Sequence, residues 1–205
     1  MKVKICGIMD IQTAEAAAGY GADALGFVFA ESKRKIEKET AREIISTLPA
    51  HIEKVGVFVD ETAEEIREIA EYTGLTLIQL HGDEGADFIR TLGMPVIKGI
   101  SFQPGSKSVI QQFGSEFILL DAPRGKYHGG NGEAFDWEAI RGLGSHTKNL
   151  ILAGGLTPEN VAEAVSIVEP YMVDVSSGVE TDGRKDLGKI KRFIENAKTG
   201  VKENV

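Results

Sequence analysis

The sequence has a single cysteine, Cys6, among 205 residues. One thiol cannot form a disulfide within the chain, so Cys6 serves either packing or chemistry, and a cytoplasmic location is expected. No apolar run approaches the roughly 18 to 20 residues that span a bilayer. The first residues also lack the apolar stretch and cleavage site of a signal peptide. These absences predict a protein that has no disulfide and no membrane partner.

Positive charge is also scarce. The 23 Lys and Arg residues are outnumbered by 31 Asp and Glu residues, which gives a formal net charge of −8 at pH 7. Because general nucleic-acid binders carry a basic surface, we expect no nucleic-acid partner. The tightest basic cluster is Lys33, Arg34 and Lys35, and three charges are more typical of a solvated loop. The charge balance leaves room for a local basic pocket and predicts a small-molecule partner.

Eight short β-branched or apolar runs recur along the chain, and segments with helical periodicity separate them. The predicted strands are 3–6, 24–29, 54–59, 76–80, 95–100, 117–121, 149–153 and 172–175. This alternation is typical of parallel β-α-β units. Eight units in one chain predict a single α/β domain over residues 1–205, a (β/α)8 TIM barrel with parallel strands. A doubly wound sheet is the alternative, although no Gly-x-Gly-x-x-Gly follows the first strand.

Capping residues and apolar spacing predict where helices begin. Thr62 opens Thr-Ala-Glu-Glu, the pattern of a capping box. Asp83 is expected to cap the next helix, and Thr157, followed by proline, predicts another helix start. The remaining expectations are helices over 40–48 and 187–194, a loop or short turn of helix over 103–112, and a frayed tail over 198–205.

Two connections are longer than the others, one after the second strand and one after the sixth. In TIM barrels the active site is built from loops at the C-terminal ends of the strands. Both connections, 31–37 and 122–134, are therefore candidate substrate loops. The second is expected to be a mobile lid because of its glycines, which are Gly125, Gly129, Gly130 and Gly132.

Glycine-rich segments follow the seventh and eighth strands. Glycines allow the backbone to approach an anion closely, and N–H groups at a helix start can bind it. Barrels often hold phosphate between these two loops. The predicted phosphate site consists of Gly154, Gly155, Ser176, Ser177 and Gly178. The alternative is that these glycines only serve tight turns.

Two reactive side chains close predicted strands. Cys6 ends the first strand and Asp121 the sixth, so both are expected at the C-terminal rim of the barrel. A thiolate can abstract a proton, and a carboxylic acid can donate one. The alternatives are a buried, inert thiol for Cys6 and a helix cap for Asp121.

Other polar residues are expected at the same rim. His81 follows Gln79 at the end of the fourth strand, and it is either a substrate ligand or a structural histidine bonded to the backbone. Arg34 either pairs bidentately with a carboxylate or is a solvated surface charge. No metal site is expected, because Cys6, His81 and Asp121 are mixed ligand types without close spacing.

In combination, these segments resemble phosphoribosylanthranilate isomerase of tryptophan biosynthesis. The resemblance extends from residue 2 to about residue 197. The segments that carry it are Lys4-Ile5-Cys6-Gly7, Gln79-Leu80-His81-Gly82, Leu120-Asp121, Gly129-Gly130-Asn131-Gly132 with Phe135-Asp136-Trp137, Leu152-Ala153-Gly154-Gly155-Leu156 and Asp174-Val175-Ser176-Ser177-Gly178-Val179-Glu180. Related phosphate-binding barrels share the two glycine loops but not the initial Cys-Gly.

The resemblance implies an Amadori rearrangement of N-(5-phosphoribosyl)anthranilate without cofactor or metal. It makes Asp121 the general acid that protonates the furanose ring oxygen and Cys6 the base that removes the C2 proton. It also implies that Arg34 contacts the anthranilate part of the substrate, where this chain has Ser32-Lys33-Arg34 instead of the usual Ser-Pro-Arg. Gln79 and His81 are expected to contact the substrate as well.

The acid role of Asp121 and the base role of Cys6 each require a suitable side-chain pKa. Asp121 needs a raised pKa, most simply through desolvation. Cys6 needs a positive charge or an N–H donor beside it. Lys4 is not an obvious source of that charge: it lies two residues before Cys6 on the same face of the strand, and the sequence does not give its reach.

Two other functions compete with the isomerase. A metal-dependent pentulose-phosphate epimerase needs a cluster of His and Asp ligands, which four histidines do not supply at strand ends. A non-catalytic binder of phosphate compounds on the same scaffold binds them without turnover. The sequence is compatible with a monomer or a homodimer.

Overall fold

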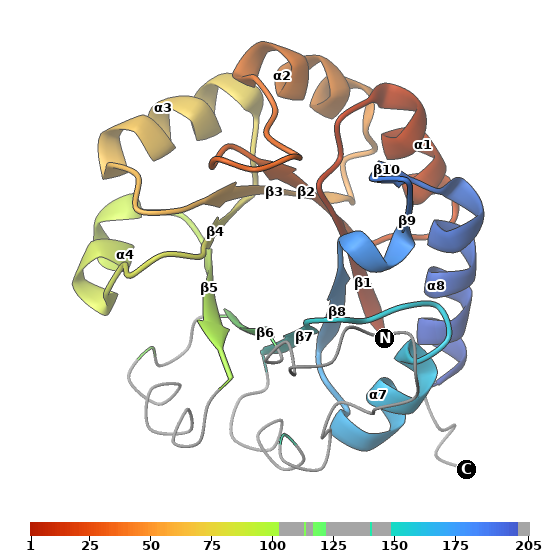
Figure 1. Ribbon diagram of the computed structural model, residues 1–205. Coiled ribbons are helices and arrows are strands. Elements are labelled where there is room, and N and C mark those ends of the chain that lie inside the picture. The colour runs from red at the N-terminus through yellow and green to blue at the C-terminus, as the bar shows by residue number, and fades with distance from the viewer. Residues whose placement is uncertain (103–112, 114–116, 122–139, 141–148, 201–205) are drawn as a thin grey trace.

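The computed structural model describes residues 1–102, 113, 117–121, 140 and 149–200. Eight parallel strands form a closed barrel in chain order, and β8 pairs back onto β1 (Figure 1). The strands are β1 (Lys2–Cys6), β2 (Ala24–Val28), β3 (Glu53–Phe58), β4 (Leu77–Leu80), β5 (Val96–Ser101), β6 (Phe117–Asp121), β7 (Leu150–Ala153) and β8 (Met172–Val175). The predicted TIM barrel is confirmed.

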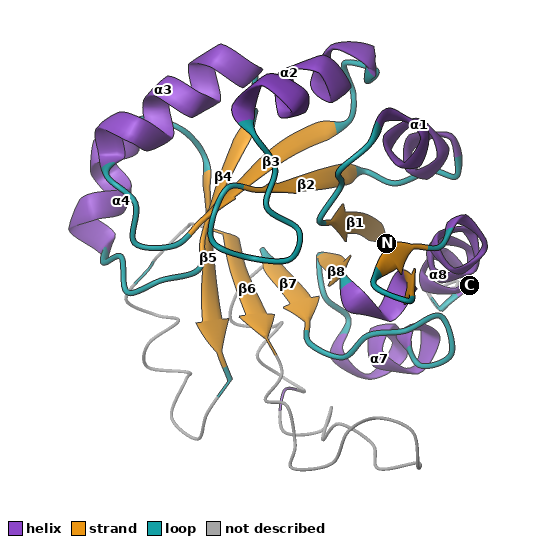
Figure 2. Cartoon of the chain, turned by 45° about the horizontal axis from the view of Figure 1, so that its top comes forward, coloured by secondary structure: helices purple, strands orange, loops and turns teal. Residues whose placement is uncertain are grey.

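Helices surround the barrel on its outer side (Figure 2). They are α1 (Ile11–Gly19), α2 (Lys38–Thr47), α3 (Ala63–Thr73), α4 (Ala86–Leu92), α7 (Val161–Val168) and α8 (Leu187–Thr199). A 3-10 turn, η1 (Ser177–Val179), and a two-stranded ribbon, β9 (Glu180–Thr181) with β10 (Arg184–Lys185), connect β8 to α8. No helix among the described residues is long and apolar enough to cross a membrane.

The strand side chains form two separate cores. One core packs the outer strand faces against the helices. The other is a cluster from six strands, with members such as Val55, Ile97 and Leu119. Side chains from strands all around a barrel can meet only inside it, so this second cluster fills the interior. Asp121 lies two residues after Leu119 and therefore faces the interior as well.

The structure corrects two predicted helix starts. Asp83 caps no helix: α4 begins after Gly85, and the Asp83 N–H donates to Asp60 Oδ1 at 2.8 Å. Helix α7 begins at Val161 and not at Thr157, because the chain first makes a turn in which Asn160 Oδ1 accepts the Thr157 N–H at 2.8 Å. Thr157 nevertheless caps the turn before α7, because its Oγ1 atom accepts the Glu159 N–H at 3.2 Å.

The start at Thr62 is confirmed, but only half of its capping box forms. Thr62 Oγ1 accepts the Glu65 N–H at 3.2 Å, whereas the Thr62 N–H donates to the neighbouring Glu61 at 2.8 Å. Helix α1 was not among the predicted helices. Its buried face consists of Thr13, Ala14 and Ala17, small side chains that give little apolar periodicity.

The predicted tail begins later than residue 198. Helix α8 continues to Thr199, and Lys198 Nζ donates to the Gly21 carbonyl at 2.6 Å. Residues 201–205, the uncertain segment 103–112 and the glycine-rich connection 122–134 lie outside the described residues.

Candidate active site

The two predicted catalytic residues end the strands to which they were assigned. Cys6 is the last residue of β1, and Asp121 is the last residue of β6. On the shorter way round the closed barrel, β7 and β8 separate these two strands. Cys6 clusters with the inward-facing Val28 and Val57 at the C-terminal end of the barrel. Both residues therefore face the interior at the same rim.

Asp121 lies beside His81. Its Oδ2 atom is 3.8 Å from His81 Nε2, and its side chain is 44% exposed within the described structure. The other ring nitrogen, Nδ1, is 3.3 Å from the Gln79 amide nitrogen. With the amide as donor, the imidazole carries its proton on Nε2, toward Asp121. The ring of His81 is thus held by a side chain, Gln79, rather than by the backbone bond of the structural alternative.

Sequence reasoning did not identify the residue that makes room for this ring. A Cβ atom on Gly99 of β5 would lie 2.7 Å from His81 Nδ1. Glycine is therefore needed on the neighbouring strand for His81 to reach across toward Asp121. Gln79 itself is buried, and its Oε1 atom has no hydrogen-bond partner among the described residues.

Cys6 lies among charged groups, of which sequence reasoning considered only Lys4 as a neighbour of the thiol. Lys4 is fully buried, and its Nζ lies 3.0 Å from Asp174 Oδ1. A Cβ atom on Gly26 would lie 2.8 Å from Cys6 Sγ and 3.1 Å from Lys4 Nζ. The side chains of Lys4 and Cys6 therefore share the space that Gly26 leaves open, and the positive charge that Cys6 requires is present.

These neighbours act on the pKa of Cys6 in opposite directions. Burial raises the pKa of the thiol above its ordinary value, and the carboxylate of Asp174 adds to that rise. The ammonium groups of Lys4 and Lys185 lower it, Lys4 more strongly. Burial also lowers the pKa of Lys4, but Asp174 and Cys6 outweigh that effect, so the pKa of Lys4 is raised.

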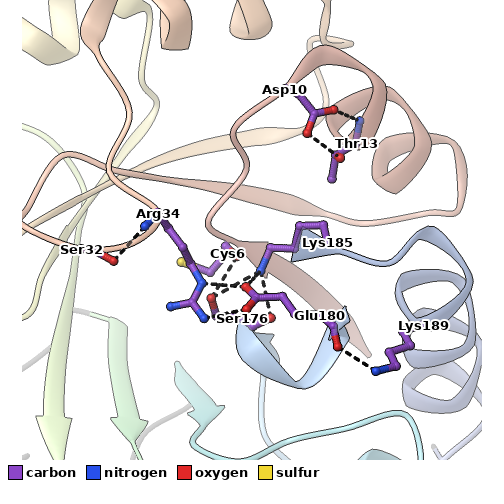
Figure 3. Close-up of polar contacts among 9 residues, drawn as sticks. All are labelled: Cys6, Asp10, Thr13, Ser32, Arg34, Ser176, Glu180, Lys185 and Lys189. Atoms are coloured by element: carbon purple, nitrogen blue, oxygen red, sulfur yellow. Dashed lines mark hydrogen bonds and ion pairs between the residues drawn. The ribbon is translucent and has the colours of Figure 1, made fainter. Parts of the chain in front are cut away.

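Arg34 is bound to Glu180 at the same rim. Its Nε and Nη2 atoms donate to the two Glu180 carboxylate oxygens at 2.6 and 2.9 Å. Lys185 Nζ donates to the same carboxylate and to the Ser176 carbonyl, both at 2.9 Å. Figure 3 shows these groups converging next to Cys6. Arg34 is therefore not the solvated surface charge of the alternative interpretation, and its bidentate partner in this structure is Glu180.

The five residues predicted to bind phosphate lie in two loops that touch. Gly154 and Gly155 have φ values of 86° and 62°, in the left-handed region that favours glycine. A Cβ atom on Gly178 would overlap the carbonyl oxygen of Leu156, which joins the loop after β8 to the loop after β7. Ser177 is exposed, whereas the Ser176 hydroxyl donates to the Cys6 carbonyl at 3.2 Å.

The arrangement suits proton transfer at a small phosphorylated molecule. It places a thiol with nearby cations on one side of the rim and a carboxyl group with an imidazole on another. The loop after β8 contacts the Cys6 backbone through Ser176 and lies against the loop after β7 at Leu156. Among the described residues, no group of three or more His, Cys, Asp or Glu side chains is arranged to hold a metal ion.

Comparisons with known proteins agree on one family. Residues 3–196 match the family model described as N-(5′-phosphoribosyl)anthranilate (PRA) isomerase. The N-(5′-phosphoribosyl)anthranilate isomerase of Bacillus cereus (strain G9842) is 55% identical over 201 residues, which are 97% of this chain and 98% of the relative.

Solved structures give the same result. The crystal structure of phosphoribosyl anthranilate isomerase from Thermotoga maritima matches with a TM-score of 0.90 and 43% identity, over 97% of this chain and 99% of the other. A phosphoribosyl anthranilate isomerase in complex with reduced 1-(o-carboxyphenylamino)-1-deoxyribulose 5-phosphate matches with a TM-score of 0.88 and 41% identity, with the same coverage. The chain belongs to the N-(5′-phosphoribosyl)anthranilate isomerase family.

Proposed function

We propose that the protein converts N-(5-phosphoribosyl)anthranilate to 1-(2-carboxyphenylamino)-1-deoxyribulose 5-phosphate in tryptophan biosynthesis. The observation that carries this proposal is the placement of Cys6 and Asp121 on inward-facing ends of β1 and β6, above one barrel opening. Membership of the isomerase family supports it. We also propose a cytoplasmic location and a monomer or homodimer, on the basis of the sequence.

Asp121 acts first, as the general acid. Its carboxyl group donates a proton to the furanose ring oxygen, and the bond between that oxygen and C1 breaks. The lone pair of the anthranilate nitrogen fills the vacancy at C1, which gives an iminium ion. His81, 3.8 Å from the Asp121 carboxyl group, is placed to orient it during this step.

Cys6 acts second, as the general base. Its thiolate takes the proton from C2, and the electron pair of that C–H bond forms the double bond of an enolamine while the iminium nitrogen is neutralised. Tautomerisation then moves the proton of the C2 hydroxyl to C1 and leaves the ketone. The cations beside Cys6 support the thiolate that this step requires.

The substrate phosphate is assigned to the loops after β7 and β8. Gly154 and Gly155 have the positive φ values that occur in anion-binding backbone turns, and the contact of Gly178 with Leu156 fixes the second loop beside the first. Arg34 uses Nε and Nη2 for Glu180, and we assign its Nη1 group to the anthranilate carboxylate.

The direct test is turnover. Purified protein should convert freshly made phosphoribosyl anthranilate without added metal, and the anthranilate fluorescence should fall during the reaction. A protein that binds the substrate without a fall in fluorescence would be the phosphate binder considered from the sequence, and the isomerase proposal would be wrong.

Arg34→Ala should raise KM roughly tenfold or more, with a smaller effect on kcat. A charge-assisted hydrogen bond to the substrate carboxylate is lost, and such bonds contribute about 1.5–3 kcal/mol. Steady-state kinetics measure this split. Arg34→Lys is the matched control, because it keeps the charge without the planar fork and should recover little affinity. A large loss of thermal stability with unchanged KM would instead assign Arg34 a structural role beside Glu180.

Gly178→Ala should weaken substrate binding and stability together. The new methyl group must push the loop after β8 away from the Leu156 carbonyl oxygen, and overpacking of this kind costs about 1–3 kcal/mol. We expect KM to rise and inorganic phosphate to become a weaker competitive inhibitor. Gly85→Ala is the control, because nothing lies within 4 Å of the added Cβ atom. Unchanged inhibition by phosphate in Gly178→Ala would argue against the proposed phosphate site.

A further inference from the structure

The barrel interior contains a buried charged pair, Lys4 and Asp174. Lys4 is 0% exposed, Asp174 is 8% exposed, and they are register partners on the neighbouring strands β1 and β8. Removing two charges from water is costly, and replacing a buried ion pair with apolar residues is often neutral or stabilising. The rest of the interior cluster is apolar, from Ala24 to Met172. The position of this pair therefore calls for a functional explanation.

The pair lies directly behind the thiol. Lys4 and Cys6 are on the same face of β1, and β2 presents Gly26 opposite Cys6. The missing side chain of Gly26 leaves a hollow that both Lys4 Nζ and Cys6 Sγ approach. Asp174 is on the other side of Lys4. The order across the interior is carboxylate, ammonium and thiol.

We propose that Lys4 is a positioning residue for Cys6: its ammonium group, anchored by Asp174, lies against the sulfur and stabilises the thiolate as it forms to remove the substrate C2 proton. This inference rests on the proposed function, because it assigns Lys4 to the base of that reaction. It also makes a statement about the thiol itself, which can be measured without substrate.

The other charged groups around Cys6 do not replace Lys4. Lys185 and Arg34 both face the thiol, but each donates to the carboxylate of Glu180, which offsets their charge. Asp174 opposes the thiolate. Lys4 has the strongest favourable effect of the group, through both its charge and a hydrogen bond to Cys6.

Lys4 acts as a fixed charge and not as a proton carrier. Asp174 and Cys6 raise the pKa of Lys4 despite its burial, so its ammonium group stays protonated as the pH rises through the neutral range. Burial raises the pKa of Cys6, so loss of Lys4 would leave the thiol protonated over a wider pH range.

The two halves of the ion pair can be tested separately because they predict opposite shifts. The protein has one cysteine, so ultraviolet thiolate absorbance against pH, with Cys6→Ser as the blank, reports on Cys6 alone. In Lys4→Met the titration midpoint should move to higher pH. In Asp174→Asn it should move to lower pH, because a neighbouring anion is removed while the ammonium remains. A merely structural pair would shift both variants in the same direction or neither.

Kinetics give a second readout. At neutral pH, kcat of Lys4→Met should fall roughly tenfold or more, since each unit of change in the thiol pKa alters the thiolate fraction about tenfold. The loss should diminish as the pH is raised, and KM should change little. An equal loss of kcat at every pH would overturn the proposal.

A matched control exists elsewhere in the barrel. Lys98 and Glu84 form a similarly buried pair, 4% and 8% exposed, with a distance of 2.8 Å between Nζ and Oε2. The double variant Lys98→Met with Glu84→Gln should leave the thiol titration unchanged. If Lys4→Met does not fold, the thiol titration of Asp174→Asn tests the proposal alone. A titration midpoint in Asp174→Asn that is unshifted or higher than in the parent protein overturns the proposal. Absence of turnover in the unmodified protein would contradict the proposed function alone, because the titrations would still report on Lys4.

Discussion

Replacing Cys6 with serine is expected to lower kcat about 10²–10⁴-fold, the usual contribution of a positioned acid or base. A serine hydroxyl fits the space of the thiol but is a far weaker acid, so it does not supply an anion at neutral pH. The surrounding cations, Lys4 and Lys185, remain in place and have nothing to stabilise. The measurement is steady-state kinetics with freshly made phosphoribosyl anthranilate.

The effect of Cys6→Ser should be confined to the chemical step. Cys6 is 7% exposed and the replacement is nearly isosteric, so the melting temperature should change little. Binding of the product or of a reduced product analogue should also be retained. A variant with full activity would show that the thiol is the inert buried group of the alternative interpretation. A variant that loses ligand binding and activity together would point to a distorted rim.

Replacing Asp121 with asparagine should cause a loss of similar size, about 10²–10⁴-fold in kcat. The amide has the shape of the carboxyl group but cannot donate a proton to the ring oxygen as an acid. Because the side chain is 44% exposed and its neighbour is His81 at 3.8 Å, the substitution leaves no buried charge unpaired. Stability measured by thermal unfolding should therefore be unchanged while activity is lost.

A matched control for Asp121→Asn is Asp87→Asn on the outer helix α4. The Asp87 side chain is 92% exposed and contacts Arg90 of the same helix. This variant should keep the activity of the parent protein. If Asp121→Asn and Cys6→Ser both retained full activity, the acid and base roles assigned here would be wrong even though the protein belongs to the isomerase family.

Much of the fold could be predicted because its signals are local. The strands at 117–121 and 172–175 were predicted with the bounds that the structure has, since each is a short buried run. Helix starts were harder to predict. Asp83 was predicted as a cap because only its own neighbours were considered, but in the fold Asp60, in the loop after β3, accepts its N–H group. This contact fixes the Asp83 backbone in the loop before α4, and a capping pattern does not show contacts between loops that are distant in the sequence.

Some features of the candidate site could also be predicted from local sequence, and others could not. By itself, the sequence determined the barrel, the strand ends that present Cys6 and Asp121, and the two glycine loops, because each depends on residues adjacent in the chain. Only the tertiary structure decided what surrounds the thiol. Lys4 meets Asp174 across 170 positions of sequence, and Arg34 meets Glu180 across 146. Those contacts exist because β8 closes the barrel against β1 in one register, and no local pattern of residues specifies that closure.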